Sequence, residues 1–339
     1  MRFSLFYNFD ILPGKPLPEL YHEVEEQALA AEAVGFDAIW FAEHHFELYG
    51  RMPSPLLFLS RISALTHTLG LGTAIVEAPH YQPLRLAEDA ALLDVLSGGR
   101  VRLGLGSGAV NKPAEFSRFG IPIEQKTART LEIAEILRQA FTTGRVDFAG
   151  AYYQYHDVEI QPAPLQPAHQ LIWLAAGSAT PELAGQCGYG LLIPRVGPLA
   201  RHYDMVTRYR STLAGKPGFV SILRFVYVAE TEQEAREQTR QTITRYAKYD
   251  CNIDWDGRTD TAEYGELLGR LNAVIGTPEQ VIAQLRGWQR EFDYEEIMCQ
   301  VYAAGMRHED SLRSLQLLGK EVIPHLISSP LSVGSGEAL

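Results

Sequence analysis

The chain has 339 residues, 46% hydrophobic and 21% charged, a composition that fits a globular protein and excludes a disordered or collagen-like chain. The net charge of −11 disfavours non-specific binding to nucleic acid or to an anionic membrane. Three widely separated cysteines form no CxxC pair, so we expect no disulfide framework, no zinc site and a cytoplasmic location. The N-terminal segment lacks a signal-peptide pattern, and no stretch approaches the ~20 apolar residues of a membrane span.

Short apolar runs alternate with helical patterns in the first half of the chain. Helix signals include a proline at the start of 53–66 and two glycines after 84–96. Strands are predicted over 2–9, 37–43, 69–76 and 101–105, and helices over 18–34, 53–66, 84–96 and 124–141.

The second half continues the alternation with two interruptions. A tyrosine-rich segment over 148–167 has a two-residue period and several prolines, which favours a hairpin outside the main sheet. The stretch 230–291 is predicted to be mostly helical, with an irregular patch near 251–262, and Gly319 is expected to end the last helix. Further strands are predicted over 171–175, 190–193, 220–228 and 296–302, and helices from 181 and over 199–213 and 311–318.

These elements make eight strand–helix units, a pattern typical of a parallel sheet. Because no interior linker divides them, we predict a closed (β/α)8 TIM barrel with insertions after strand four and near residue 250. The barrel domain is expected to cover 1–325, and the Ser/Gly-rich stretch 326–339 to form a flexible tail. Catalytic residues of such barrels lie at the carboxyl ends of the strands.

Two histidines follow the predicted second strand, in Glu43-His44-His45-Phe46. Because neighbouring strand residues point to opposite faces, at most one of them faces the barrel interior. A histidine there is a candidate general acid or base, since its usual pKa of about 6.5 lies near working pH. A hydrogen-bonded core histidine is the alternative. The sequence clusters no further ligands convincingly, so we expect no metal.

A glycine-rich loop, GLGSGAV (104–110), follows the predicted fourth strand and fits the GxGxxA pattern of dinucleotide-binding loops. That pattern needs a helix directly after the loop and a place in the first βαβ unit. Here Asn-Lys-Pro follows, in the fourth unit. We therefore expect either a tight turn or a backbone that approaches a flat or anionic ligand, with Ser107 as a hydroxyl donor.

Small residues follow the predicted fifth strand over 175–181 (AAGSATP) and lead into a helix. Free backbone N–H groups and the helix dipole make such a start a candidate anion site, to which Ser178 and Thr180 add hydroxyls. Capping of the helix by one of these hydroxyls is the alternative. A phosphate site here would depart from the usual position after strands seven and eight.

Four segments in this order resemble the bacterial luciferase-like flavin monooxygenases: WFAEHHF, the stretch from GTAIVEAPH to SGGR, GLGSG with the following NK, and LAAGSAT. The resemblance covers about residues 1–190 well and is weaker to about 330. It implies a dimeric barrel that takes reduced FMN from a separate flavin reductase. It also implies that a flavin hydroperoxide, formed with O2, oxygenates a small organic substrate.

The resemblance also implies roles for single residues. His44 matches the active-site histidine that supports turnover of the hydroperoxide, which would make it the acid/base. Ala74 and Ile75 match a non-prolyl cis peptide beneath the flavin ring. The cofactor-binding residues expected in this way are Ala74, Ile75, Gly106, Ser107, Gly108, Ala176, Gly177, Ser178 and Ala179.

At two loops the sequence departs from luciferase. Gly106 replaces a reactive cysteine, and Ser107 replaces a phosphate-binding arginine. Gly177 and Ser178 match a glutamate and a serine of the phosphate loop. The phosphate would then rest on backbone amides, on Ser178 or on another arginine such as Arg195.

The departures leave alternatives open. A deazaflavin-dependent hydride-transfer enzyme and a flavin-binding protein without catalysis are the two other hypotheses. In the favoured reading, Phe6, Ile75 and loop aromatics exclude water from the site, and the segments 142–170 and near 250 form a lid.

Overall fold

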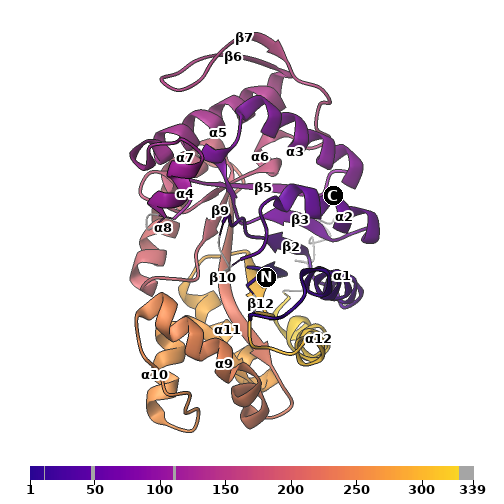
Figure 1. Cartoon of the computed structure of the whole chain (residues 1–339), viewed down its shortest axis with the longest axis vertical. Coiled ribbons are helices and arrows are strands. Elements are labelled where there is room, and N and C mark those ends of the chain that lie inside the picture. The colour runs from indigo at the N-terminus through magenta and orange to yellow at the C-terminus, as the bar shows by residue number, and fades with distance from the viewer. Residues whose placement is uncertain (11, 47–49, 110–111, 328–339) are drawn as a thin grey trace, which may run out of the picture.

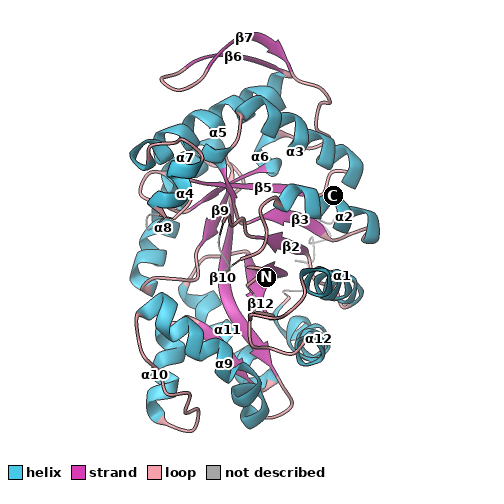
Figure 2. Cartoon of the chain, in the orientation of Figure 1, coloured by secondary structure: helices cyan, strands magenta, loops and turns pink. Residues whose placement is uncertain are grey.

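Eight parallel strands close into a barrel at the centre of the protein, and helices surround them (Figures 1 and 2). The computed structural model describes residues 1–10, 12–46, 50–109 and 112–327. In barrel order the strands are β1 (Arg2–Tyr7), β2 (Ala38–Phe41), β3 (Gly70–Thr73), β5 (Val101–Gly106), β8 (Ile172–Ala175), β9 (Gly190–Ile193), β10 (Phe219–Val228) and β12 (Glu296–Gln300). β12 pairs with β1, and β9 pairs with β10, so the sheet closes. The predicted (β/α)8 barrel is confirmed.

Helices connect these strands on the outside of the barrel, where they cover the outward-facing side chains of the sheet. They are α1 (Leu17–Ala33), α2 (Pro55–Leu65), α3 (Pro83–Ser97), α4 (Pro113–Arg118), α5 (Lys126–Thr143), α6 (Ala168–Leu171), α7 (Thr180–Cys187), α8 (Leu199–Thr212), α9 (Glu232–Cys251), α10 (Ala262–Arg270), α11 (Pro278–Glu291), α12 (His308–Leu317) and α13 (Ile323–Leu326). Every helix of the described residues is too short or too polar to span a bilayer.

The tyrosine-rich segment forms the predicted hairpin from β6 (Arg145–Ala149) and β7 (Gln154–Glu159). Its turn is held on α5, because Glu132 accepts hydrogen bonds from the backbone of residues 151–153. In Figure 1 the hairpin projects beyond α5, at the opposite end of the molecule from α9 and α10. The expected lid built from both segments is therefore wrong, since they do not meet.

The stretch 230–291 contains a strand that the sequence analysis missed. β11 (Ala273–Gly276) pairs with residues 225–228 of β10, beyond the part of β10 that pairs with β9. Four apolar residues between two helices give no period by which a strand can be told from a helix. The irregular patch is confirmed, because residues 252–261 form no helix or strand.

Two helix boundaries were predicted wrongly. The six-residue helix α4 opens at Pro113, directly after the glycine-rich loop, where no helix was expected. Gly319 does not end the last helix but lies inside a π-helical turn over Leu318–Val322 that continues into α13. A Cβ at Gly319 would lie 2.4 Å from the Cβ of Val34, so the glycine permits close packing against the end of α1.

Glycines on neighbouring strands make room for two indole rings inside the barrel. Trp40 of β2 lies opposite Gly72 of β3, and Trp173 of β8 lies opposite Gly190 of β9. A Cβ at either glycine would come within 2.2 Å of the facing ring. The two indoles meet edge to face at 5.2 Å and fill the middle of the barrel.

A buried ion pair lies beside these indoles. The fully buried Glu296 of β12 accepts hydrogen bonds from Trp40 Nε1 and Arg102 Nη1, both at 2.8 Å. The Arg102 guanidinium also lies 5.8 Å from the Trp40 and Trp173 rings. The Arg102 charge and the Trp40 indole N–H together satisfy a carboxylate that burial alone would penalise.

Candidate functional site

The predicted site residues lie at the carboxyl ends of neighbouring strands, on one mouth of the barrel. His44 follows β2, and Ala74 and Ile75 follow β3. Gly106 ends β5, and the loop 176–179 follows β8, which pairs directly with β5. The fold thus brings together segments that are far apart in the sequence.

His44 is held on both of its ring nitrogens. Its Nε2 lies 2.7 Å from Asn8 Oδ1 at the end of β1, and its Nδ1 lies 3.3 Å from Lys112 Nζ. Because an amide oxygen only accepts, this arrangement places the hydrogen on Nε2 and the lone pair on Nδ1. Gly50 packs against the ring, and a Cβ there would lie 2.2 Å from His44 Cδ2.

The surroundings of His44 keep the imidazole neutral. Burial, and then the positive charge of Lys112, lower the pKa of His44 to about 3. The sequence argument relied on an ordinary pKa near neutrality, and the structure corrects that premise. At neutral pH the ring has an acceptor lone pair at Nδ1 and a hydrogen at Nε2.

Two carboxyl groups extend the network from Lys112. Glu115 Oε2 lies 3.5 Å from Lys112 Nζ, and one oxygen each of Glu115 and Glu77 lies within 4.8 Å of a His80 nitrogen. Burial and the neighbouring Glu115 raise the pKa of Glu77. Burial opposes ionisation of Glu115 too, but its contact with Glu77 and the charge of Lys112 hold its pKa below the usual value. The pair thus favours one shared proton.

His44 and His45 lie beyond the end of β2, so strand alternation does not apply to them, and His45 has partners of its own. Its Nε2 lies 2.6 Å from Glu43 Oε1, and Tyr81 donates to the other oxygen of Glu43 at 2.7 Å. Glu43, His45 and His80 come close enough to hold an ion, a clustering that the sequence analysis missed because it joins two separate segments, the one after β2 and the turn at 78–80. The expectation of no metal stays a prediction.

The segment after β3 forms an apolar wall beside β5. The Ala74–Ile75 peptide bond is cis, as the resemblance implied. Both residues are half-buried and pack against the buried cluster that contains Phe6 of β1. A Cβ at Gly106 would lie 2.2 Å from Ile75 Cδ1, so the luciferase cysteine would not fit here without a shift of Ile75. Ser107 and Gly108 follow and are half-buried.

The loop 176–179 leaves the start of α7 without a side-chain cap. Ala179 is the N-cap residue, so the alternative of capping by Ser178 or Thr180 is wrong. The Thr180 hydroxyl accepts from Gly177 N at 2.8 Å and donates to Ala175 O at 2.6 Å. It therefore shapes the loop and leaves the first-turn amides of α7 to another acceptor.

The arginine at this loop is not the one expected. Arg195 pairs with Asp250 at 2.6 Å and lies over the Tyr246 ring. Arg208 of α8 instead donates to Ser178 O at 2.6 Å and pairs with Glu182. No motif pointed to Arg208, because its contact depends on how α8 packs beside α7.

We predict that the buried imidazole makes the protein sensitive to acid. Above pH about 6.5 the ring is neutral in both folded and unfolded chains. Below it the unfolded chain binds a proton that folded His44 takes up only near pH 3, so stability falls as pH falls through this window.

Urea unfolding of the wild type and His44→Gln between pH 7 and pH 4 tests this, with the exposed His22→Gln as a matched control. The His44→Gln variant should lose less stability on acidification than either of the other proteins. Equal losses in all three would contradict the prediction.

Comparisons with known proteins agree with this geometry. The family model described as luciferase-like monooxygenase matches residues 1–294. The oxygenase component of the flavin-dependent trigonelline monooxygenase of Acinetobacter baylyi is 26% identical, with 96% of this chain and 95% of that protein covered.

Two further relatives bear on fold and cofactor. The crystal structure of the monooxygenase RslO1 from Streptomyces bottropensis superimposes with a TM-score of 0.87 at 26% identity, covering 96% of this chain and all of the other. The F420-dependent glucose-6-phosphate dehydrogenase of Amycolatopsis mediterranei is 31% identical over 175 residues, 50% of this chain and 52% of that protein.

Proposed function

Since this chain belongs to the luciferase-like monooxygenase family, we propose that it binds reduced FMN and uses O2 to oxygenate a small organic substrate, with His44 as the acid/base. The observation that carries the proposal is the shared barrel mouth. A neutral imidazole, a half-buried apolar wall and an uncapped helix start lie there on neighbouring strand ends.

The residues of this mouth fit a flavin mononucleotide. The wall at Ala74 and Ile75 offers a flat ring an apolar surface, and the amides of the loop 176–179 suit a phosphate. A Cβ at Gly177 would meet only Thr180 Oγ1, at 3.5 Å, so space above the loop is open. Arg208 adds a positive charge at Ser178. When bound, reduced FMN would supply the electrons that activate O2.

The chain's own contribution is proton handling in a site that excludes water. The Nδ1 lone pair of His44 faces the Lys112 ammonium, which in turn contacts Glu115. Because the pKa of His44 is about 3, the imidazole stays neutral, and its Nδ1 lone pair positions the Lys112 ammonium beside the Glu77–Glu115 pair, which can hold one shared proton. Phe6 and Ile75 keep the reacting face apolar.

A comparison of FMN with riboflavin tests the phosphate site. Gly177→Asp places a negative charge in the open space of the loop. We expect this variant to bind reduced FMN at least about tenfold more weakly, a loss of about 1.4 kcal/mol in binding free energy. Its affinity for riboflavin, which has no phosphate, should be unchanged. Gly265→Asp, also in open space, is the matched control.

The chemistry needs a second measurement. Anaerobic protein with reduced FMN is mixed with oxygenated buffer, and flavin reoxidation is followed by absorbance. Protein-bound flavin should reoxidise in a phase distinct from that of free FMN. Absence of binding at micromolar protein, or reoxidation identical to that of free FMN, would contradict the proposal.

The similarity to an F420-dependent dehydrogenase keeps hydride transfer as the second candidate. Ser107 stands where luciferase has a phosphate-binding arginine, and this difference favours the hydride-transfer hypothesis over a site of the luciferase type. Parallel titrations with reduced FMN and F420 separate the two. A flavin-binding protein without catalysis would bind flavin but leave its reoxidation unchanged.

Two partners belong to the proposal. The trigonelline relative is named an oxygenase component, and we propose that this chain likewise receives reduced flavin from a separate reductase. We also propose a homodimer, because exposed leucines gather on α2 and α3. Leu57 is 75% exposed and Leu96 is 62% exposed.

The double variant Leu57→Glu/Leu96→Glu should therefore be monomeric when the wild type is dimeric, because charge would oppose burial of that face. Sedimentation velocity measures both proteins, and Ile327→Glu, at another exposed apolar residue, serves as control. A monomeric wild type or a dimeric double variant would contradict this prediction.

A further inference from the structure

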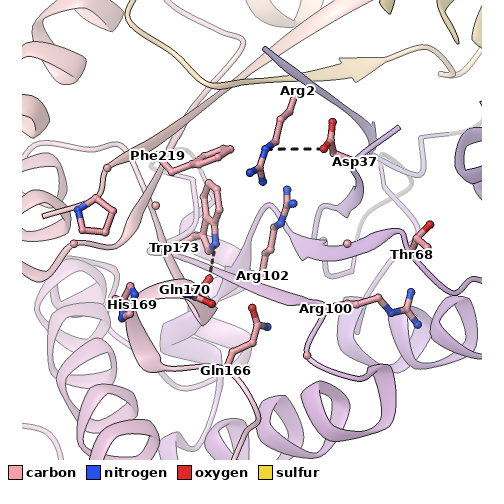
Figure 3. Close-up of a pocket in the computed structure, with 16 residues that line it drawn as sticks. Arg2, Asp37, Thr68, Arg100, Arg102, Gln166, His169, Gln170, Trp173 and Phe219 are labelled. Carbon is pink, nitrogen blue, oxygen red and sulfur yellow. Dashed lines mark hydrogen bonds and ion pairs between the residues drawn. The ribbon is translucent and has the colours of Figure 1, made fainter. Parts of the chain in front are cut away.

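A second cavity opens at the other mouth of the barrel, where the strands begin. It has a volume of about 480 Å³, within the usual range for small-molecule sites. Arg2 starts β1, Arg102 lies near the start of β5, and Phe219 starts β10 (Figure 3). His44 follows the carboxyl end of β2, so the Trp40 and Trp173 layer separates this cavity from the proposed catalytic mouth.

Positive charge dominates the lining of this cavity in a protein whose net charge is −11. The lining contains three arginines and one acidic residue, Asp37. Glu296, buried beneath, neutralises Arg102. Arg100 donates to carbonyl oxygens and to Thr66 Oγ1, so its hydrogen bonds leave its charge in place. An anion is the ligand that such a lining favours.

The guanidinium group of Arg2 can bind a ligand in this cavity. Its Nε lies 4.0 Å from Asp37 Oδ1, at the limit of an ion pair, and half of its side chain is exposed. Within the described ranges its guanidinium makes no hydrogen bond. Arg102 uses Nη1 for Glu296, and the described residues offer its other guanidinium nitrogens no acceptor. Two planar donor groups therefore remain with hydrogens to give.

Aromatic rings lie beside both guanidinium groups. Arg2 lies 5.0 Å from the Phe219 ring, and Phe219 meets Trp173 edge to face at 5.1 Å. Figure 3 shows these two rings next to Arg2 and Arg102. Phe219 is half-buried and lines the cavity. A flat ring can pack there while its edge reaches the guanidinium groups.

We propose that this lower mouth is a second binding site, which takes a single-ring aromatic carboxylate. A carboxylate matches the planar donors of Arg2 and Arg102, and the ring matches Phe219. A tetrahedral phosphate would use the charge but not the aromatic wall. The bound carboxylate replaces the long contact between Arg2 and Asp37.

The test uses isophthalate (benzene-1,3-dicarboxylate) as the probe and isothermal titration calorimetry on the full chain. Saturable one-site binding is expected, and Arg2→Gln should weaken it by at least about tenfold. Arg2 is exposed, so the variant should fold, which its thermal midpoint verifies. Arg240→Gln, an exposed arginine on α9, is the matched control and should bind as the wild type does.

Two further arms make the outcome decisive. Benzene-1,3-dicarboxamide has the same shape without charge and should not bind. His44→Ala, at the opposite mouth, should bind isophthalate as the wild type does, whatever its effect on turnover. Absence of saturable binding, equal binding by Arg2→Gln, equal binding of the diamide, or loss of binding in His44→Ala alone would overturn the proposal.

Discussion

His44→Ala is expected to lower oxygen-dependent product formation by about 10²–10⁴-fold, the usual contribution of a positioned acid or base. The variant removes the imidazole that offers its Nδ1 lone pair to Lys112 while bonded through Nε2 to Asn8. Its neighbours remain in place, because Asn8 and Lys112 belong to other elements. Binding of reduced FMN should therefore change little, and kcat should carry the loss.

His22→Ala, on the exposed face of α1, is the control for the loss of an imidazole. Lys112→Met adds a diagnostic readout. Removing the ammonium makes protonation of His44 less unfavourable, so the pKa of His44 should rise from about 3 towards its usual value. The acid limb of the pH profile should then move to higher pH. Full turnover in His44→Ala, with an unchanged profile in Lys112→Met, would exclude His44 from the mechanism.

Glu296→Ala should be the most destabilising of the substitutions considered, at about 3 kcal/mol or more. The change leaves Arg102 beside two indoles without its carboxylate, and it leaves Trp40 Nε1 without an acceptor. The loss should lie at the lower end of the range for broken buried pairs, because the Arg102 side chain is 16% exposed and water can reach it.

Urea unfolding at pH 7 measures the loss as a lower midpoint at similar slope. Glu296→Gln keeps an acceptor for Trp40 and should be less destabilised than the alanine variant. The exposed Glu266→Ala is the matched control and should stay within about 0.5 kcal/mol of wild type. Wild-type stability in Glu296→Ala would show that the buried pair adds nothing to the fold.

The barrel was predictable because its strands carry the signal that sequence analysis uses best. All eight barrel strands were predicted within a few residues, since each is a short apolar run between helical patterns. β11 was missed because a four-residue apolar run has no distinguishing period. The prediction that Gly319 ends the last helix was wrong, because in sequence a glycine needed for packing against Val34 cannot be told from one that ends a helix.

The site was predictable only one residue at a time. His44 and the loop 176–179 are conspicuous because they follow predicted strands. Asn8, Lys112 and Glu115 are ordinary polar residues in sequence and gain meaning only when three strand ends meet. The depressed pKa of His44 shows the same limit, because it arises first from burial, which no motif reports.

The two tryptophans at the centre of the barrel restrict the paths by which small molecules can reach the proposed site. Trp40 and Trp173 are nearly inaccessible to solvent, and the Arg102–Glu296 pair lies beside them. These side chains fill the barrel interior, so it does not form an open channel between the two mouths. In the proposed function, oxygen, substrate and product would therefore enter and leave at the carboxyl ends of the strands. Any reactive oxygen species formed there would be released on that same side, away from the ligand proposed for the cavity at the other mouth.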